Sequence, residues 1–276
     1  MSRARLATLA LLAFAPLLLA GDDPSQAARA KAMREIAQAV QVQSSDGAKV
    51  ELVDEPVYRW DDPARRFGDG TVWVYGTSGR PTALLTLSLN QNVQTGVEWL
   101  HELAALTDTR FAAESRDGWL WSPSGPGMMF RPIPNAPVPA TDEAKRLRQL
   151  NEQARRFKAF ELFDPSSDGR VQRYELRLLT KPVYRYKDAA RGILDGGVYL
   201  IAYGRNPEIV LVVEARADGK AAPQWSYGLG RISTAGLHVM LDDQDLAPWP
   251  GDEARYGPNR PYHIFGLPAR GLNAEK

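Results

Sequence analysis

The chain contains no cysteine, which excludes disulfide bridges, thiolate chemistry and lipid attachment through an N-terminal cysteine. Histidine is scarce, with 3 in 276 residues, and no zinc motif is present. Opposite charges nearly cancel, with 34 Lys and Arg against 33 Asp and Glu, so no overall field attracts nucleic acid or an anionic membrane. The chain also lacks a phosphate loop, a dinucleotide fingerprint and a Gly-x-Ser-x-Gly motif. From these absences we predict no cofactor and no nucleic-acid partner.

No apolar run is long enough to predict a membrane span. The longest candidate, Leu6–Ala20, has fifteen residues after a basic start, whereas a spanning helix needs about twenty. This pattern is typical of a signal peptide over residues 1–21, with cleavage after Ala20 or after Ala27. We therefore expect a mature chain that is exported to the periplasm or the exterior and has no membrane span. An uncleaved N-terminal anchor is the alternative interpretation.

One stretch of the chain occurs twice. Residues 56–87 align with residues 182–213 without a gap, at an offset of 126, and twelve of thirty-two positions are identical. Composition alone would give roughly two identities. We therefore predict an internal duplication, in which shared residues serve the scaffold. Residues that differ between the copies are the better candidates for function.

Each copy is expected to be a helix followed by an antiparallel meander of four to five strands, which is an α+β fold. Capping signals predict one helix over 24–43 and another that begins at Thr141-Asp142-Glu143, and a Ser-Ser-Asp-Gly sequence follows each. The order of elements is that of cystatin-like folds, an analogy of topology that carries no function. The predicted organisation is a signal peptide (1–21), a first repeat (22–122), a Pro-rich connector (123–140) and a second repeat (141–276).

The segment Glu98–Leu106 is helical by propensity, but its counterpart at the offset of 126 contains two glycines and alternates in the manner of a strand. We therefore predict strands at both places, and place turns at Asp69-Gly70 and Ser78-Gly79.

A calcium loop is the sharpest motif. Oxygen-bearing side chains stand at positions 1, 3, 5 and 12 of this loop, with Gly169 at position 6; they are Asp164, Ser166, Asp168 and Glu175. Against this interpretation, Pro182 leaves little room for the exiting helix that would carry Glu175. A polar turn that leads into a strand is the favoured prediction, and calcium is the alternative.

His101 beside Glu102 could be a base next to a carboxylate, yet neighbouring side chains in a strand point to opposite faces. A packing role for His101, between Trp99 and Leu103, is favoured. Binding remains a hypothesis for this residue.

Two further groups are candidate binding residues. Arg65 and Asp69 recur as Arg191 and Asp195, and could hold an anion or, as we favour, fix their own loop. Trp119 and Trp121, next to the connector, could form an aromatic surface for a sugar or peptide.

Several short motifs are spread over most of the mature chain: Trp60, Asp69-Gly70, Gly79-Arg80-Pro81, His101-Glu102, Arg146-Leu147-Arg148-Gln149, Leu176–Leu179, Pro182–Tyr186 and Pro207-Glu208. With this set the chain resembles an uncharacterised family of exported proteins typical of planctomycete-type bacteria. The resemblance implies export and one shared architecture, and it implies no activity.

The favoured function is therefore that of an exported, non-enzymatic binding or structural protein with an envelope polymer or a protein as partner. The alternatives are an envelope-polymer hydrolase with a site between the repeats and a calcium-binding module at 164–175.

Overall fold

The computed structural model describes residues 24–62, 67–92, 96–164, 169–217, 222–246, 248–251 and 256–269. Within these residues the fold is mostly antiparallel sheet, with 51% strand and 13% helix. The predicted α+β class, with a helix as a major part of each repeat, is therefore wrong. The sequence did not predict the strand that directly follows each helix or the strands of two residues, because segments this short show little periodicity. The predicted share of strand was therefore too low.

The described residues of the first half of the chain, within 24–122, form one helix and eight strands. They are α1 (Pro24–Ala39), β1 (Val40–Ser44), β2 (Lys49–Val50), β3 (Tyr58–Asp62), β4 (Phe67–Tyr75), β5 (Ala83–Asn92), β6 (Gly96–Ala105), β7 (Phe111–Ser115) and β8 (Leu120–Trp121). The connector contributes β9 (Arg131–Pro132).

The second half, residues 141–269, begins in the same order and ends with one additional strand. Its elements are α2 (Glu143–Ala154), β10 (Phe157–Phe163), β11 (Gln172–Leu178), β12 (Tyr184–Asp188), the short 3-10 helix η2 (Ala189–Arg191), β13 (Ile193–Tyr203), β14 (Asn206–Arg216), β15 (Gln224–Arg231), β16 (Gly236–Leu241), β17 (Gln244–Asp245) and β18 (Tyr262–Pro268).

Strand pairing follows one pattern in both halves. In the first, β1 pairs with β2 and β7, while β3, β4, β5 and β6 form a meander. In the second, β10 pairs with β11 and β16, while β12, β13, β14 and β15 form a meander. The halves differ because β11 also pairs with β13, which joins the second set into one curled half-barrel sheet. They also differ because β18 pairs with β6, across the predicted repeat boundary.

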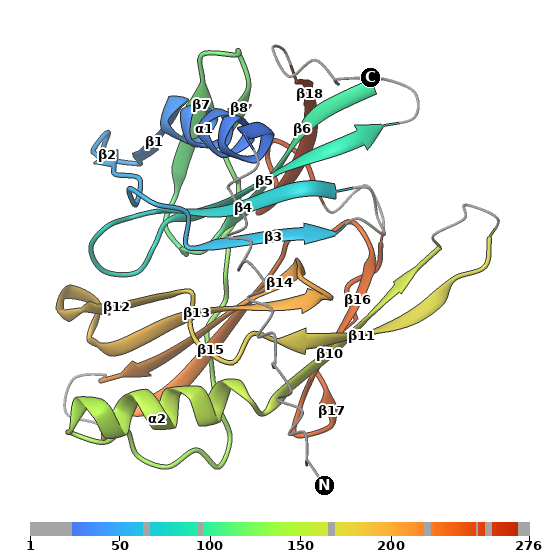
Figure 1. The fold of residues 1–276 in the computed structure, drawn as a ribbon. Coiled ribbons are helices and arrows are strands. Elements are labelled where there is room, and N and C mark those ends of the chain that lie inside the picture. Colours follow the sequence, from blue (N-terminus) through green and yellow to red (C-terminus); the bar gives the residue numbers. More distant parts are fainter. Residues whose placement is uncertain are drawn as a thin grey trace, which may run out of the picture.

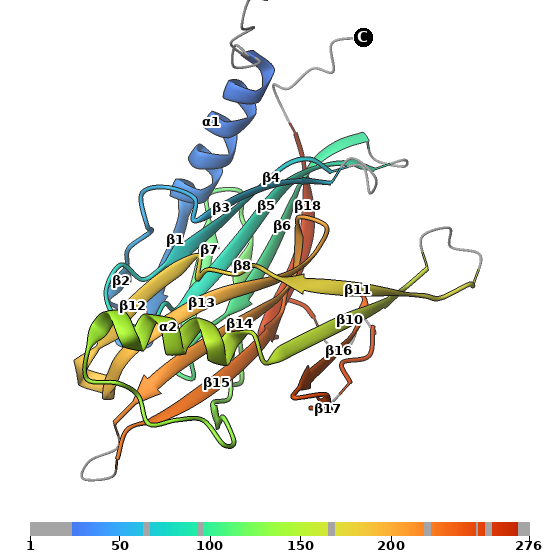
Figure 2. The same ribbon diagram turned by 60° about the horizontal axis from the view of Figure 1, so that its bottom comes forward.

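The two meanders pack face to face. Their shared core contains Val72 and Leu84 from the first half and Val198 and Val210 from the second, all fully buried. The opposite face of each meander is covered by the helix of its own half, so that α1 and α2 lie on the two outer sides (Figure 1). The β10–β11 hairpin projects from the body (Figure 2).

Both helices form where their caps predict, but the first is shorter than expected. α1 ends at Ala39, and residues 40–43, predicted as its last turn, belong to β1, in which Val40 and Val42 are buried. The α2 cap is confirmed, because the Asp142 side chain accepts a hydrogen bond from the Lys145 amide. Among the described residues, neither helix is long and apolar enough to cross a membrane.

The comparison of the two copies assigned the ambiguous segment correctly. Residues 98–106, helical by propensity, lie mostly in β6, and their counterpart lies in β15. The prediction of a turn at Asp69-Gly70 is wrong, since both residues lie within β4. A Cβ on Gly70 would lie 2.2 Å from the Trp60 indole, so the glycine makes room for the ring.

An arginine ties each helix to its meander. In the first half Arg29 on α1 forms an ion pair with Asp69 on β4. In the second, Asp195 on β13 is fully buried, and Arg146 on α2 donates to it at 3.1 Å while Arg185 donates at 2.8 and 2.7 Å. The predicted pairing of Arg191 with Asp195 is not observed.

A buried ion pair joins the two halves. Arg80, in the turn between β4 and β5, donates two hydrogen bonds of 2.7 Å to the Glu214 carboxylate on β14. Both side chains are at most 1% exposed. The Tyr186 hydroxyl donates to the same carboxylate at 2.6 Å. An exposed pair, Arg205 with Asp61, also joins the halves.

Candidate functional site

His101 lies in the core, as its packing role predicts. It is 1% exposed and stacks on Phe265 with 4.8 Å between ring centres. Its Nδ1 contacts the carbonyl oxygen of Trp99 at 3.0 Å, and burial lowers its pKa to about 4. Glu102 points to the opposite face, towards the second half, so the two side chains do not form a catalytic pair.

The other predicted binding residues are not brought together. Asp69 is engaged by Arg29, and Arg65 lies outside the described residues. Trp121 is fully buried and its indole nitrogen donates to the Arg260 carbonyl oxygen at 2.8 Å, so the expectation of a surface position fails for it. Trp119 is half-buried against Phe265. These two tryptophans complete the core of the first half.

The residues of the calcium motif lie along a hairpin. Asp164 follows β10 and accepts a hydrogen bond from the Gly169 amide at 2.6 Å. Glu175 lies within β11, opposite Phe160, and its carboxylate accepts from Arg173. Asp164 lies four residues beyond Phe160, so Glu175 is about 13 Å from it along the hairpin. Ser166 and Asp168 lie outside the described residues. No described group of three or more His, Asp or Glu side chains could hold a metal ion.

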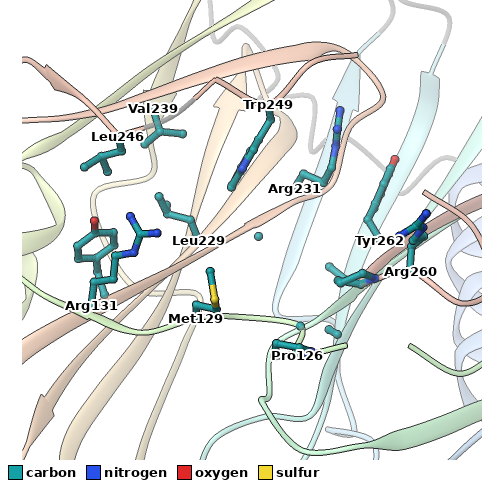
Figure 3. A pocket seen from close by; sticks show the side chains of 16 residues that line it. Pro126, Met129, Arg131, Leu229, Arg231, Val239, Leu246, Trp249, Arg260 and Tyr262 are labelled. Atoms are coloured by element: carbon teal, nitrogen blue, oxygen red, sulfur yellow. The ribbon is translucent and has the colours of Figure 1, made fainter. Parts of the chain in front are cut away.

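A pocket of about 670 Å³ lies between the connector and the second half. β15 forms one wall and the connector another, with further residues from β16, from the end of β6 and from the segment before β18 (Figure 3). The lining residues are Ala104, Ala105, Pro126, Gly127, Met129, Arg131, Tyr227, Leu229, Gly230, Arg231, Val239, Leu246, Trp249, Arg260, Pro261 and Tyr262.

The polar groups of this lining are mainly hydrogen-bond donors. Arg231 is held in place by three backbone carbonyls, those of Ser233, Ala235 and Pro250. Arg131 and Arg260 are exposed, lie at opposite ends of the pocket, and form no ion pair with any described residue (Figure 3). No described lining residue carries a carboxylate. The pocket is therefore an apolar space with positive charge at both ends.

A buried acid adjoins the pocket without lining it. Glu102 on β6 is 7% exposed and accepts a hydrogen bond of 2.6 Å from the hydroxyl of Tyr262. Burial raises the pKa of Glu102 to about 7, although the Tyr262 donor acts in the opposite direction. This carboxyl therefore exchanges a proton near neutral pH behind the pocket wall.

Sequence reasoning missed most of the pocket. The lining residues belong to segments far apart in the chain, and composition gives no reason to bring them together. One signal in the sequence did indicate the pocket, because some of its lining residues differ in type between the two copies. At the offset of 126, Arg231 corresponds to Ala105 and Tyr227 to His101. In the first half Trp121 and Phe111 pack together in the core, with 5.0 Å between ring centres.

No family model, curated protein or solved structure matches this chain.

Proposed function

We propose that this chain is an exported, non-enzymatic binding protein, and that its pocket takes a ligand with an apolar body and a negative charge. The observation that carries the proposal is the pocket lining, which is apolar in the middle and has at its ends the guanidinium groups of Arg131 and Arg260, neither of which is paired with a described residue.

The chemistry of the lining favours an anionic ligand. A guanidinium group forms charge-assisted hydrogen bonds with a carboxylate, and these are stronger than bonds between neutral groups. The centre of the pocket offers Leu229, Val239 and Trp249 for apolar contact. Pockets of this size and composition commonly bind small ligands.

The same lining favours binding over hydrolysis. Hydrolysis of a polymer requires a nucleophile or a general acid and base within reach of the substrate. The described lining has no Ser, Thr, Asp, Glu, Lys or His side chain. Glu102, which adjoins the pocket, is covered by Tyr262.

We also infer that the two halves are copies of one unit. The support is the common order of strand pairing and the common helix-to-meander arginine, Arg29 with Asp69 and Arg146 with Asp195. In this interpretation the pocket is not repeated in the first copy, because it is built from the second copy and the connector, with Ala104 and Ala105 contributed by the first copy.

Octanoate and octanol provide a matched test, because they share an apolar chain and differ in charge. We expect calorimetric titration to show saturable binding of octanoate, about tenfold tighter than that of octanol. Arg131→Ala and Arg260→Ala should each weaken octanoate binding by up to about tenfold and leave octanol binding unchanged.

Two variants control this experiment. Arg116→Ala removes an exposed arginine in the turn between β7 and β8 and should bind both ligands as the unmodified protein does. Leu246→Trp adds volume to the pocket lining and should abolish binding of both. Equal affinities for the two ligands, or binding that Leu246→Trp does not change, would contradict the proposal.

A further inference from the structure

The edge of β15 that faces the pocket is only partly covered. β9 pairs with β15 at Ser226 and Tyr227, and the connector residues before β9 no longer pair with the strand, although the side chains of Met128 and Phe130 pack against Gly228. The Ile133 amide donates to the Trp225 carbonyl oxygen on this edge. Backbone groups alternate between the two edges of an antiparallel strand, so Leu229 directs its N–H and C=O groups to the same edge. No described residue forms a hydrogen bond with either group.

The equivalent edge in the first half is covered. β6 is the counterpart of β15, and β18 pairs with it from Glu98 to Ala104, over seven residue pairs. β9 forms only two such pairs with β15. Beyond them, Leu229 is one of the residues that line the pocket.

We propose that the pocket binds a short extended peptide, which adds antiparallel to β15 at Leu229 and places its free C-terminal carboxylate beside Arg131. This inference rests on the proposed function and specifies its ligand. A strand edge offers a donor and an acceptor to any peptide backbone, and alternate side chains of the peptide can then enter apolar pockets. A fatty acid can use the apolar lining and the arginines but has no groups that match the N–H and C=O of Leu229.

The direction of the peptide follows from β9. Since β9 runs antiparallel to β15, a peptide that continues the line of β9 opposite Leu229 ends where β9 begins, at Arg131. Its carboxylate then lies next to that guanidinium group. Arg260, at the other end of the pocket, remains available for an acidic side chain or for solvent (Figure 3).

The probe is the tetrapeptide acetyl-Val-Leu-Val-Leu with a free C-terminus, measured by calorimetric titration of the full chain. We expect saturable binding and an affinity about tenfold lower for the C-terminal amide. Arg131→Ala should remove the difference between acid and amide, whereas Arg116→Ala should preserve it.

Single N-methyl groups along the probe test the strand pairing directly. In an antiparallel pair every second residue turns its N–H towards the partner strand. N-methylation should therefore weaken binding by about tenfold at alternate positions and have little effect at the positions between them. Sensitivity at every position or at none would overturn the proposed pairing.

The outcomes separate the two proposals. Binding of octanoate without binding of the peptide overturns this inference and leaves the proposed function standing. Absence of binding by both overturns both. Peptide binding with equal affinity for acid and amide overturns the placement of the carboxylate at Arg131.

Discussion

Replacing Arg80 by methionine is expected to lower the free energy of unfolding by about 3 to 5 kcal/mol. The substitution leaves the Glu214 carboxylate, which is fully buried between the halves, without its bidentate partner. The Tyr186 hydroxyl and the partly exposed Arg216, whose Nε lies 3.9 Å from the carboxylate, cannot offset the desolvation of this charge. Urea unfolding followed by tryptophan fluorescence measures the change.

The cause of this loss can be tested by removing the charge as well. The double variant Arg80→Met with Glu214→Gln keeps an acceptor for Tyr186 and should recover much of the lost stability. Arg205→Ala is the control, because Arg205 and Asp61 also join the halves but are 66% and 45% exposed. Its effect should be under about 1 kcal/mol. A similar small effect for Arg80→Met would show that the buried pair does not hold the halves together.

Glu102→Gln should change how stability depends on pH. The folded pKa of Glu102 is about 7, above the usual 4.5, so the folded state binds the proton more tightly than the unfolded state does. The contribution of this bound proton to the free energy of unfolding is therefore present in full below pH 4.5 and is lost as pH rises through 7. The difference corresponds to about 3 kcal/mol. The variant should lack this decrease and be more stable than the unmodified protein at pH 8.

Urea unfolding at several values between pH 4.5 and pH 8 checks this prediction. Glu152→Gln removes an exposed carboxylate on α2 and should reproduce the unmodified profile. Parallel profiles for Glu102→Gln and the unmodified protein would mean that Glu102 does not titrate in this window.

Local signals in the sequence predicted parts of the fold well. Asp142 caps α2 as expected, and the comparison of copies placed β6 and β15 correctly against helical propensity. The strand β1 was missed because it follows α1 without a glycine or proline between them. Five alternating residues are then easily assigned to the helix.

Long-range pairing was the part that local signals could not supply. Arg131 lies in a proline-rich connector whose composition indicates only that it forms neither a helix nor a central strand. Its position beside the pocket depends on β9 pairing with β15, nearly a hundred residues later in the chain. The partner of Glu102 was missed for the same reason, since Tyr262 is 160 residues away.

The pairing of β18 with β6 has a consequence for the order of folding. At a synthesis rate of about 5 to 20 residues per second, β6 leaves the ribosome roughly 10 to 30 s before β18 does. Until then its outer edge, from Glu98 to Ala104, has no partner. An unpaired apolar edge can associate with other chains, so the nascent protein passes through an interval in which a chaperone or rapid folding must protect this strand.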